Sequence, residues 1–267
     1  MKPFLKIILQ LILFIILTVV TQIGGVVYLL SLFVLSFRKQ KSNIRISIVF
    51  TGLYLLSTFF LIPFVAPIFG REKIITTEGI HSTNYMTILL NRNYVRPELN
   101  KILLQTEKDL KGTAIKIHYL DANFPFINNF PLLPHLSHND GKKIDISLIY
   151  EKENGAISEK QKSVSGYGVF VNSKANEFNQ IKTCLEKGFF QYDYPKYITF
   201  GEINKNLVFS EKGTKRLINS ILKNKNVGKI FIEPHLKKRM NLSNSRIRYH
   251  GCRAVRHDDH IHLQLVK

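Results

Sequence analysis

The segment HDDHIHLQLVK, residues 257–267, carries three histidines, His257, His260 and His262. From His260 onward, polar and apolar residues alternate in the manner typical of a short strand. Successive side chains of a strand point to opposite faces, so His260 and His262 lie on the same face. Two imidazoles on one face can bind one metal ion. The segment therefore predicts a metal site on this strand.

A second segment, HLSHNDGKKID at residues 135–145, offers His135, His138 and Asp145 as further ligands. Imidazole nitrogens and carboxylate oxygens are donors that zinc accepts. Gly141 can form the turn that lets His138, in a loop, and Asp145, on a strand, reach the same ion. A catalytic zinc site keeps one position open for water beside its protein ligands. The two segments hold more donors than one ion needs, so the remaining histidines are free for acid–base chemistry.

A sheet must position these ligands, and the second part of the chain has the pattern of an α+β domain. Apolar residues recur at helical spacing over 95–110, where Pro97 suits the first turn, and over 211–224. The run 121–134, rich in proline and asparagine, predicts an irregular loop leading to His135. We also predict a helix within 172–188, a weak strand at 189–201, and strands at 114–120, 143–150, 227–232 and 260–266. The predicted fold class is α+β, with an antiparallel sheet that carries the metal site.

The first 70 residues differ in composition from the rest of the chain, because they contain no Asp or Glu. Two apolar runs, about 7–37 and 46–69, each exceed the roughly 20 residues that span a bilayer, so we predict two transmembrane helices. We expect the first to be one long, tilted helix; a break at Gly24-Gly25 and a cleaved signal peptide are the alternatives. The basic segment RKQKSNIR between the runs is of the type retained in the cytoplasm. This predicts an integral, multi-pass cell-membrane protein with an anchor at 1–70 and a globular domain at 71–267 on the periplasmic side.

The chain is strongly basic, with 38 Lys and Arg against 19 Asp and Glu and a formal net charge of +19. Such a balance favours anionic partners. Lipid headgroups and an acidic cell-wall polymer suit an exported domain, whereas nucleic acid is not an expected partner; the alternative is that the lysines are merely solvated. Cys184 and Cys252 are the two cysteines, and an oxidising compartment would permit a disulfide between them, although their spacing does not establish it.

The pattern SHxxGxxxD, followed far downstream by HDDHxH and a short strand, resembles the penicillin-insensitive murein endopeptidases. These belong with the lysostaphin-type peptidases, the D-Ala-D-Ala carboxypeptidases and the hedgehog signalling domain. The resemblance extends over about residues 90–267 in layout and implies a hedgehog/D-Ala-D-Ala-peptidase-like domain. It implies one zinc ion per domain, bound by three ligands: His138, Asp145 and His262.

The same resemblance implies roles for the other clustered histidines. His260 would act as general base or transition-state stabiliser, and His257 and His135 would occupy further active-site positions. We also expect Asp258 and Asp259 to orient the imidazoles, because a ligating histidine usually donates its second N–H to a carboxylate or a carbonyl. We interpret the other histidines as structural residues: His81, His118, His235 and His250.

The implied substrate is the peptide portion of peptidoglycan, in particular the D-Ala to diaminopimelate cross-link. A D,D-carboxypeptidase or an L-Ala-D-Glu endopeptidase of the same zinc group is the alternative among enzymes. A catalytically silent, zinc-dependent module that binds or senses the cell wall is the alternative outside them. The sequence leaves the oligomeric state open.

Overall fold

The computed structural model describes residues 3–37 and 42–266. The chain forms two compact units, which we call the helical unit and the sheet unit. The helical unit comprises Met1–Ile74, Met86–Pro97 and Ala122–Gly141, and the sheet unit comprises Ile75–Tyr85, Glu98–Asp121 and Lys142–Lys267. The predicted domain boundary at residue 71 stays a prediction.

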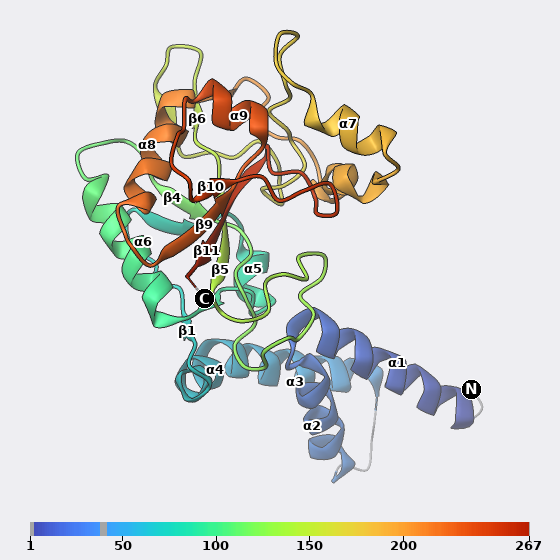
Figure 1. The fold of residues 1–267 in the computed structure, drawn as a ribbon. Coiled ribbons are helices and arrows are strands. Elements are labelled where there is room, and N and C mark those ends of the chain that lie inside the picture. Colours follow the sequence, from blue (N-terminus) through green and yellow to red (C-terminus); the bar gives the residue numbers. More distant parts are fainter. Residues whose placement is uncertain (1–2, 38–41, 267) are drawn as a thin grey trace. The chain divides into compact units, whose positions relative to one another are not determined.

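Apolar helices make up most of the helical unit (Figure 1). They are α1 (Pro3–Thr21), α2 (Gly24–Ser36), α3 (Asn43–Leu56), the π-helical η1 (Ser57–Leu61), α4 (Ile62–Val65) and the 3-10 helix η2 (Ala66–Phe69). A short antiparallel pair of β1 (Glu72–Lys73) and β3 (Tyr94–Val95) follows, together with α5 (Tyr85–Leu89).

The prediction of a single helix over 7–37 is wrong, because the run is divided into α1 and α2. Gln22 lies between them in the left-handed region, with φ of +67°. Two glycines then allow α2 to begin close to α1: a Cβ on Gly24 would lie 2.9 Å from the carbonyl oxygen of Leu17. A Cβ on Gly25 would lie 2.7 Å from that of Phe14. A side chain at either glycine would collide with the α1 backbone, so the close approach of α2 to α1 requires glycine at both positions.

Two helical segments of the described chain are long and apolar enough to cross a membrane, Phe4–Thr21 and Asn43–Phe69. The second corresponds to the predicted span at 46–69, whereas Gly24–Ser36 is a shorter apolar helix. The predicted basic loop lies largely outside the described residues, since its members Arg38, Lys39 and Lys41 belong to 38–41. The predicted orientation and multi-pass topology therefore stay predictions.

A six-stranded sheet is the centre of the sheet unit, in the order β10-β9-β11-β5-β4-β2 (Figure 1). Its strands are β2 (Ile80–Ser82), β4 (Ile117–Tyr119), β5 (Lys143–Ser147), β9 (Val227–Phe231), β10 (Ile247–Arg248) and β11 (His260–Leu265). The four central strands are antiparallel, as predicted, but β2 and β10 pair in parallel with their neighbours. The sheet is therefore mixed, and the α+β class is confirmed.

The helices predicted at 95–110 and 211–224 are confirmed as α6 (Pro97–Asp109) and α8 (Glu211–Leu222). Leu99, Ile102 and Leu103 bury one face of α6. Ser210 caps α8 by accepting a hydrogen bond of 3.2 Å from the backbone N–H of Gly213. The two helices lie together on one side of the sheet (Figure 1).

The middle of the sheet unit was predicted less well. The helix expected within 172–188 is reduced to α7 (Gln180–Glu186), and the weak strand expected at 189–201 is instead the 3-10 helix η3 (Phe190–Ile198). The cysteines do pair: Cys184 in α7 forms a disulfide with Cys252. The remaining elements are α9 (Pro234–Arg239) and a small sheet of β6 (Tyr150–Glu151), β7 (Ile157–Ser158) and β8 (Val208–Phe209).

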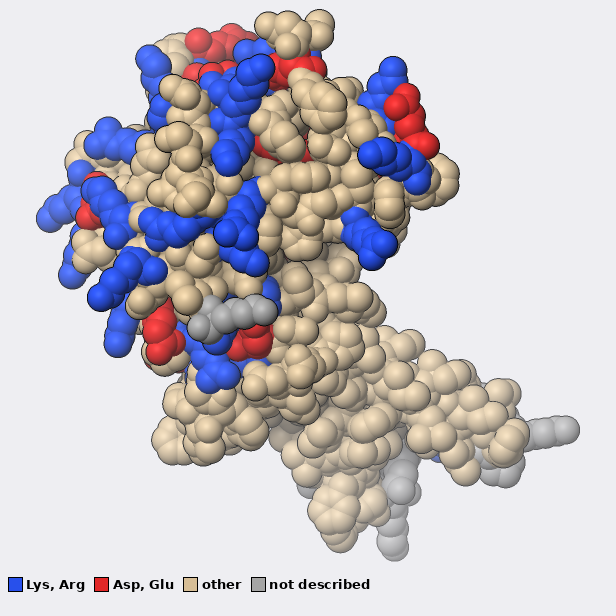
Figure 2. All heavy atoms as spheres, in the orientation of Figure 1, with Lys and Arg blue, Asp and Glu red and all other residues tan. Residues whose placement is uncertain are grey.

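Basic side chains gather on the face of the sheet unit around α6 and α8, whereas the apolar helices show few in this view (Figure 2). Exposed members on or next to the two helices include Lys101, Lys108, Lys212, Arg216 and Lys223. Lysine and arginine side chains thus cover much of the surface that this view shows around α6 and α8.

We expect the protein to lose stability in acid because His118 on β4 is held in its neutral form. Its ring lies opposite His81 on β2, with ring centres 6.0 Å apart. Burial, and secondarily the charge of His81, lowers the pKa of His118 to about 4. The unfolded chain, with an ordinary pKa of about 6.5, therefore takes up a proton that the folded chain excludes as the pH falls from about 6.5 to about 4.

The free energy of unfolding of the parent protein should fall as the pH is lowered from 7 to 4.5, and that of His118→Gln should fall less. The difference is about 1.4 kcal/mol for each unit by which folding lowers the pKa of His118. Thermal unfolding of the full chain in detergent, followed by circular dichroism at both pH values, measures the difference. Equal losses in parent and variant would contradict the assignment.

Candidate metal centre

Two adjacent strands bring together the carboxylate and one histidine of the site. His262 on β11 pairs directly with Asp145 on β5, so the two side chains stand opposite each other on the same face. The Nδ1 of His262 lies 2.8 Å from the Oδ1 of Asp145. The Nε2 of His260 lies 3.7 Å from the same oxygen. His260 and His262 thus share one face of β11, as the strand period predicts.

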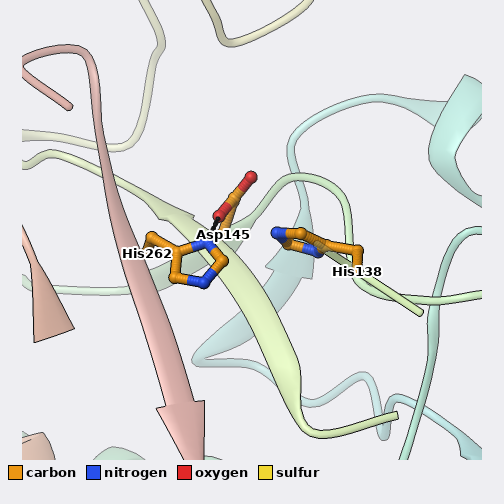
Figure 3. Close-up of side chains that lie close together, drawn as sticks. All are labelled: His138, Asp145 and His262. Atoms are coloured by element: carbon orange, nitrogen blue, oxygen red, sulfur yellow. Dashed lines mark hydrogen bonds and ion pairs between the residues drawn. The ribbon is translucent and has the colours of Figure 1, made fainter. Parts of the chain in front are cut away.

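His138 completes a group of three metal-type donors with Asp145 and His262 (Figure 3). Each of the three residues offers one ligand atom, and these atoms all lie within 4.8 Å of one another. All three side chains are buried. Figure 3 shows the imidazoles of His262 and His138 on either side of the Asp145 carboxylate.

The orientation of His138 suits metal binding. Its Nδ1 donates a hydrogen bond of 2.7 Å to the carbonyl oxygen of Ala122, so Nδ1 carries the hydrogen and Nε2 is the nitrogen whose lone pair can bind a metal. Gly141 forms the predicted turn after it, with a φ of +81° that favours glycine. Two imidazoles and one carboxylate form a donor set that fits a divalent metal ion.

A carboxylate next to it in the chain fixes His260. The Oδ1 of Asp259 lies 2.5 Å from the Nδ1 of His260, and the Oδ2 of Asp259 accepts a hydrogen bond of 2.6 Å from the backbone of Gly168. Burial alone would lower the pKa of His260, but the charges of Asp259 and Asp145 outweigh it and raise this pKa to about 9. In the protein without metal, His260 therefore carries a proton at neutral pH.

The other two predicted site histidines lie close to the donor group. The ring of His257 is 4.9 Å from that of His260 and 5.8 Å from that of His262. Burial, and then the neighbouring imidazoles, holds the pKa of His257 well below its ordinary value, so this ring is neutral. The ring of His135 is 5.6 Å from that of His138. The structure thus brings each predicted site histidine next to another member of the cluster.

Only one of the two aspartates expected to orient imidazoles bonds to a site histidine. Asp259 does so, whereas Asp258 accepts two hydrogen bonds, of 2.7 and 2.6 Å, from the guanidinium of Arg256. Arg256 also bonds to Asp193 at 2.7 Å and to Asn172 at 2.8 Å. Asp258 thus helps to hold the chain just before β11 rather than an imidazole of the donor group.

Of the four histidines interpreted as structural, His235 lies apart from the donor group and His250 lies close to it. His235 fits that interpretation, because its Nε2 donates to the carbonyl oxygen of Val171 at 2.7 Å. His250 does not stand apart from the site, since its ring lies 5.6 Å from that of His257 and 6.4 Å from that of His262. His250 therefore lies at the edge of the histidine cluster, with an exposed side chain.

Sequence reasoning also missed Tyr167. Its hydroxyl donates to the Oδ2 of Asp145 at 2.9 Å and accepts from the backbone N–H of Asp121 at 3.1 Å. Its ring meets that of His260 edge to face, 5.1 Å between centres. In the sequence, its position between Gly166 and Gly168 is the feature that could have indicated a tightly turned segment at Tyr167. Both glycines have positive φ in the structure.

Replacing Tyr167 with Phe is expected to weaken metal binding about 10- to 100-fold, the usual effect of losing a partner that orients a ligand. The physical reason is that the Oδ2 of Asp145 loses the Tyr167 hydroxyl as hydrogen-bond donor, so the orientation of the carboxylate is fixed less firmly. Competition with a chromogenic chelator measures the affinity. Tyr197→Phe is the control, because that side chain is 73 % exposed. Parental affinity in Tyr167→Phe would refute the role.

The fold and the donor group define this chain as an α+β protein with a buried His-Asp-His cluster centred on neighbouring antiparallel strands. No protein-family model matches the chain, and no curated protein matches it. The resemblance to murein endopeptidases therefore remains a hypothesis that rests on the two motifs.

Proposed function

We propose that the chain is a membrane-held zinc metallopeptidase that hydrolyses peptide cross-links of peptidoglycan, of the D-Ala to diaminopimelate type. One observation carries the proposal: a buried group of two imidazoles and one carboxylate lies beside a further histidine, His260, that is held by its own carboxylate, Asp259. A purely structural metal site needs its ligands but not an oriented acid–base group next to them.

His138, Asp145 and His262 would hold the metal ion. The ion would supply Lewis-acid activation of water and of the amide carbonyl. Asp259 keeps the Nδ1 of His260 engaged, so that its Nε2 is the atom available for proton transfer. In the hydrolysis, the oxygen of water adds to the carbonyl carbon and the C–N bond breaks. His260 delivers a proton to the leaving amine nitrogen, and the proton that the attacking water loses replaces it on His260. The Asp259 carboxylate beside Nδ1 stabilises the protonated imidazole, which supports this proton-donating role.

The exposed side chain of His250 would contact the substrate peptide, and the buried rings of His257 and His135 would support the site from beside the donor group. Neutral imidazoles can donate and accept hydrogen bonds with peptide amide groups. Their positions beside the donor group support this role.

Three features support a location outside the cytoplasm. Two helical segments are apolar and long enough to cross a membrane. The Cys184–Cys252 disulfide suits an oxidising compartment. The basic surface of the sheet unit suits an anionic wall polymer. Together they favour a multi-pass protein with its site on the periplasmic side.

Defined muropeptides test the proposal. The full chain in detergent, loaded with zinc, is incubated with cross-linked dimers, and mass spectrometry identifies the products before and after treatment with a chelator. We expect monomers from cleavage at the D-Ala to diaminopimelate bond, loss of this activity with chelator, and its return with zinc. Release of terminal D-Ala would indicate a D,D-carboxypeptidase, and cleavage between L-Ala and D-Glu the other endopeptidase. Zinc binding without any product would favour a binding or sensor module.

A further inference from the structure

The loop that carries His135 and His138 packs within the helical unit. We call residues 122–141 the histidine loop. Arg71, two residues after η2, is its main hydrogen-bond donor, and its side chain is only 1 % exposed. Its guanidinium donates to the carbonyl oxygen of Phe124, to that of Ile127 at 3.5 Å, to the Oδ1 of Asn128 at 2.6 Å and to the carbonyl oxygen of Asn139 at 3.2 Å.

These contacts reach the residue next to the metal-type ligand, since Asn139 follows His138 in the chain. Burial and the charge of Arg96 lower the pKa of Arg71 to about 10, so its guanidinium stays charged at neutral pH. Hydrogen bonds from a charged donor are roughly twice as strong as neutral ones. One side chain thus ties together both ends of the histidine loop.

A second contact joins the loop to the break between α1 and α2. The Oε1 of Gln22 accepts a hydrogen bond of 2.9 Å from the backbone N–H of Phe126. Gln22 is 6 % exposed and holds the left-handed conformation that separates the two helices. The ring of Phe126 lies 5.0 Å from that of Phe69 and packs on a cluster that includes Ile23 and Ala66.

The loop is also closed on itself around His138. The Ala122 carbonyl accepts from the ring of His138, and the backbone N–H of Asn129 donates to the carbonyl oxygen of Asn139 at 2.8 Å. The backbone N–H of Gly141 donates to the Oδ1 of Asn123 at 3.1 Å. A displacement of the loop by loss of Arg71 would therefore move His138 with it.

We propose that the apolar helices help to build the metal site as well as anchoring the chain, with Arg71 and Gln22 as positioning residues for His138. This inference rests on the proposed metal site but not on the proposed hydrolytic reaction. The histidine loop has little regular secondary structure, and ordering backbone costs about 1–2 kcal/mol per residue. Contacts from the helical segment offset part of that cost before any metal binds.

Arg71→Lys tests the inference in the full chain in detergent. Lysine keeps the charge, but a single ammonium cannot reproduce the fork that spans these acceptors. Arg246→Lys is the matched control, because Arg246 likewise donates to backbone carbonyls, those of Leu222, Asn224 and Val227, but within the sheet unit. Zinc affinity by chelator competition, the visible absorption of bound cobalt, and hydrogen exchange of the 122–141 amides are measured in each protein.

We expect Arg71→Lys to bind zinc about 10- to 100-fold more weakly, with an altered cobalt spectrum and faster exchange in the histidine loop. Gln22→Leu, which removes the acceptor for Phe126, should change the same three measurements in the same direction. Arg246→Lys should match the parent in all of them.

Parental affinity and parental loop exchange in Arg71→Lys would overturn the inference, as would equal weakening in Arg246→Lys, which would indicate general destabilisation. If the parent binds no metal, the proposed function fails instead, and loop exchange alone then decides whether Arg71 holds the histidine loop. Unchanged exchange in that case would overturn the inference too.

Discussion

Replacing Asp145 with Asn is expected to abolish metal binding and hydrolysis together. Asp145 supplies the negative charge of the donor group, and its Oδ1 lies 2.8 Å from the Nδ1 of His262. The amide is nearly isosteric but neutral, so it neither balances a divalent cation nor holds the imidazole as strongly. A bound metal contributes several kcal/mol to transition-state stabilisation, and we expect hydrolysis to fall on the order of a thousand-fold or more.

Zinc content by atomic absorption after gel filtration, together with muropeptide hydrolysis, measures both effects. Asp109→Asn is the matched control, because Asp109 on α6 pairs with Lys223 at 3.0 Å, far along the chain from the donor group. It should retain metal and activity. A zinc content in Asp145→Asn equal to that of the parent would show that the metal lies elsewhere.

Replacing His260 with Ala is expected to separate catalysis from metal binding. His260 is not one of the three donors, but its Nε2 lies 3.7 Å from the Asp145 carboxylate. Loss of a positioned acid–base group typically lowers the rate about 10²- to 10⁴-fold. We therefore expect hydrolysis to fall by that factor while about one zinc ion per chain remains bound.

The rate of muropeptide cleavage and the zinc content of the same sample are compared. His81→Ala serves as the control, since His81 lies on the edge strand β2 and bonds through Nε2 to the carbonyl oxygen of Glu78 at 2.7 Å. Full hydrolysis by His260→Ala would exclude its assigned role. Loss of zinc from that variant would instead make His260 a ligand.

The strand that carries the site was predictable because its pattern is local. His260 and His262 share a face since side chains alternate along a strand, and the structure pairs that face with Asp145. Gly141 was predictable for the same reason, because the turn after His138 requires positive φ. Periodicity also identified α6 and α8, whose apolar faces are buried.

Predictions failed where a distant partner determines the conformation. The composition of the first apolar run predicts one helix, yet Gln22 interrupts it. The Oε1 of Gln22 accepts a hydrogen bond from the backbone N–H of Phe126, 104 residues away in the chain. The segment 189–201 has strand-like composition but forms η3, beside the α7 helix that the disulfide holds. Local propensity is a weak determinant when tertiary contacts oppose it.

Ligand chemistry and element periodicity are properties of short windows of sequence, so the order of residues was enough to propose candidate ligands in the segments 135–145 and 257–267. The resemblance to the murein endopeptidases then selected His138, Asp145 and His262 among them. The supports of that site act across long separations: Tyr167 on Asp145, and Arg71 on the histidine loop. No window contains both partners of such a contact. Only the tertiary structure shows which side chains hold the ligands in place. Burial strengthens these hydrogen bonds, because the protein interior has a lower dielectric constant than water.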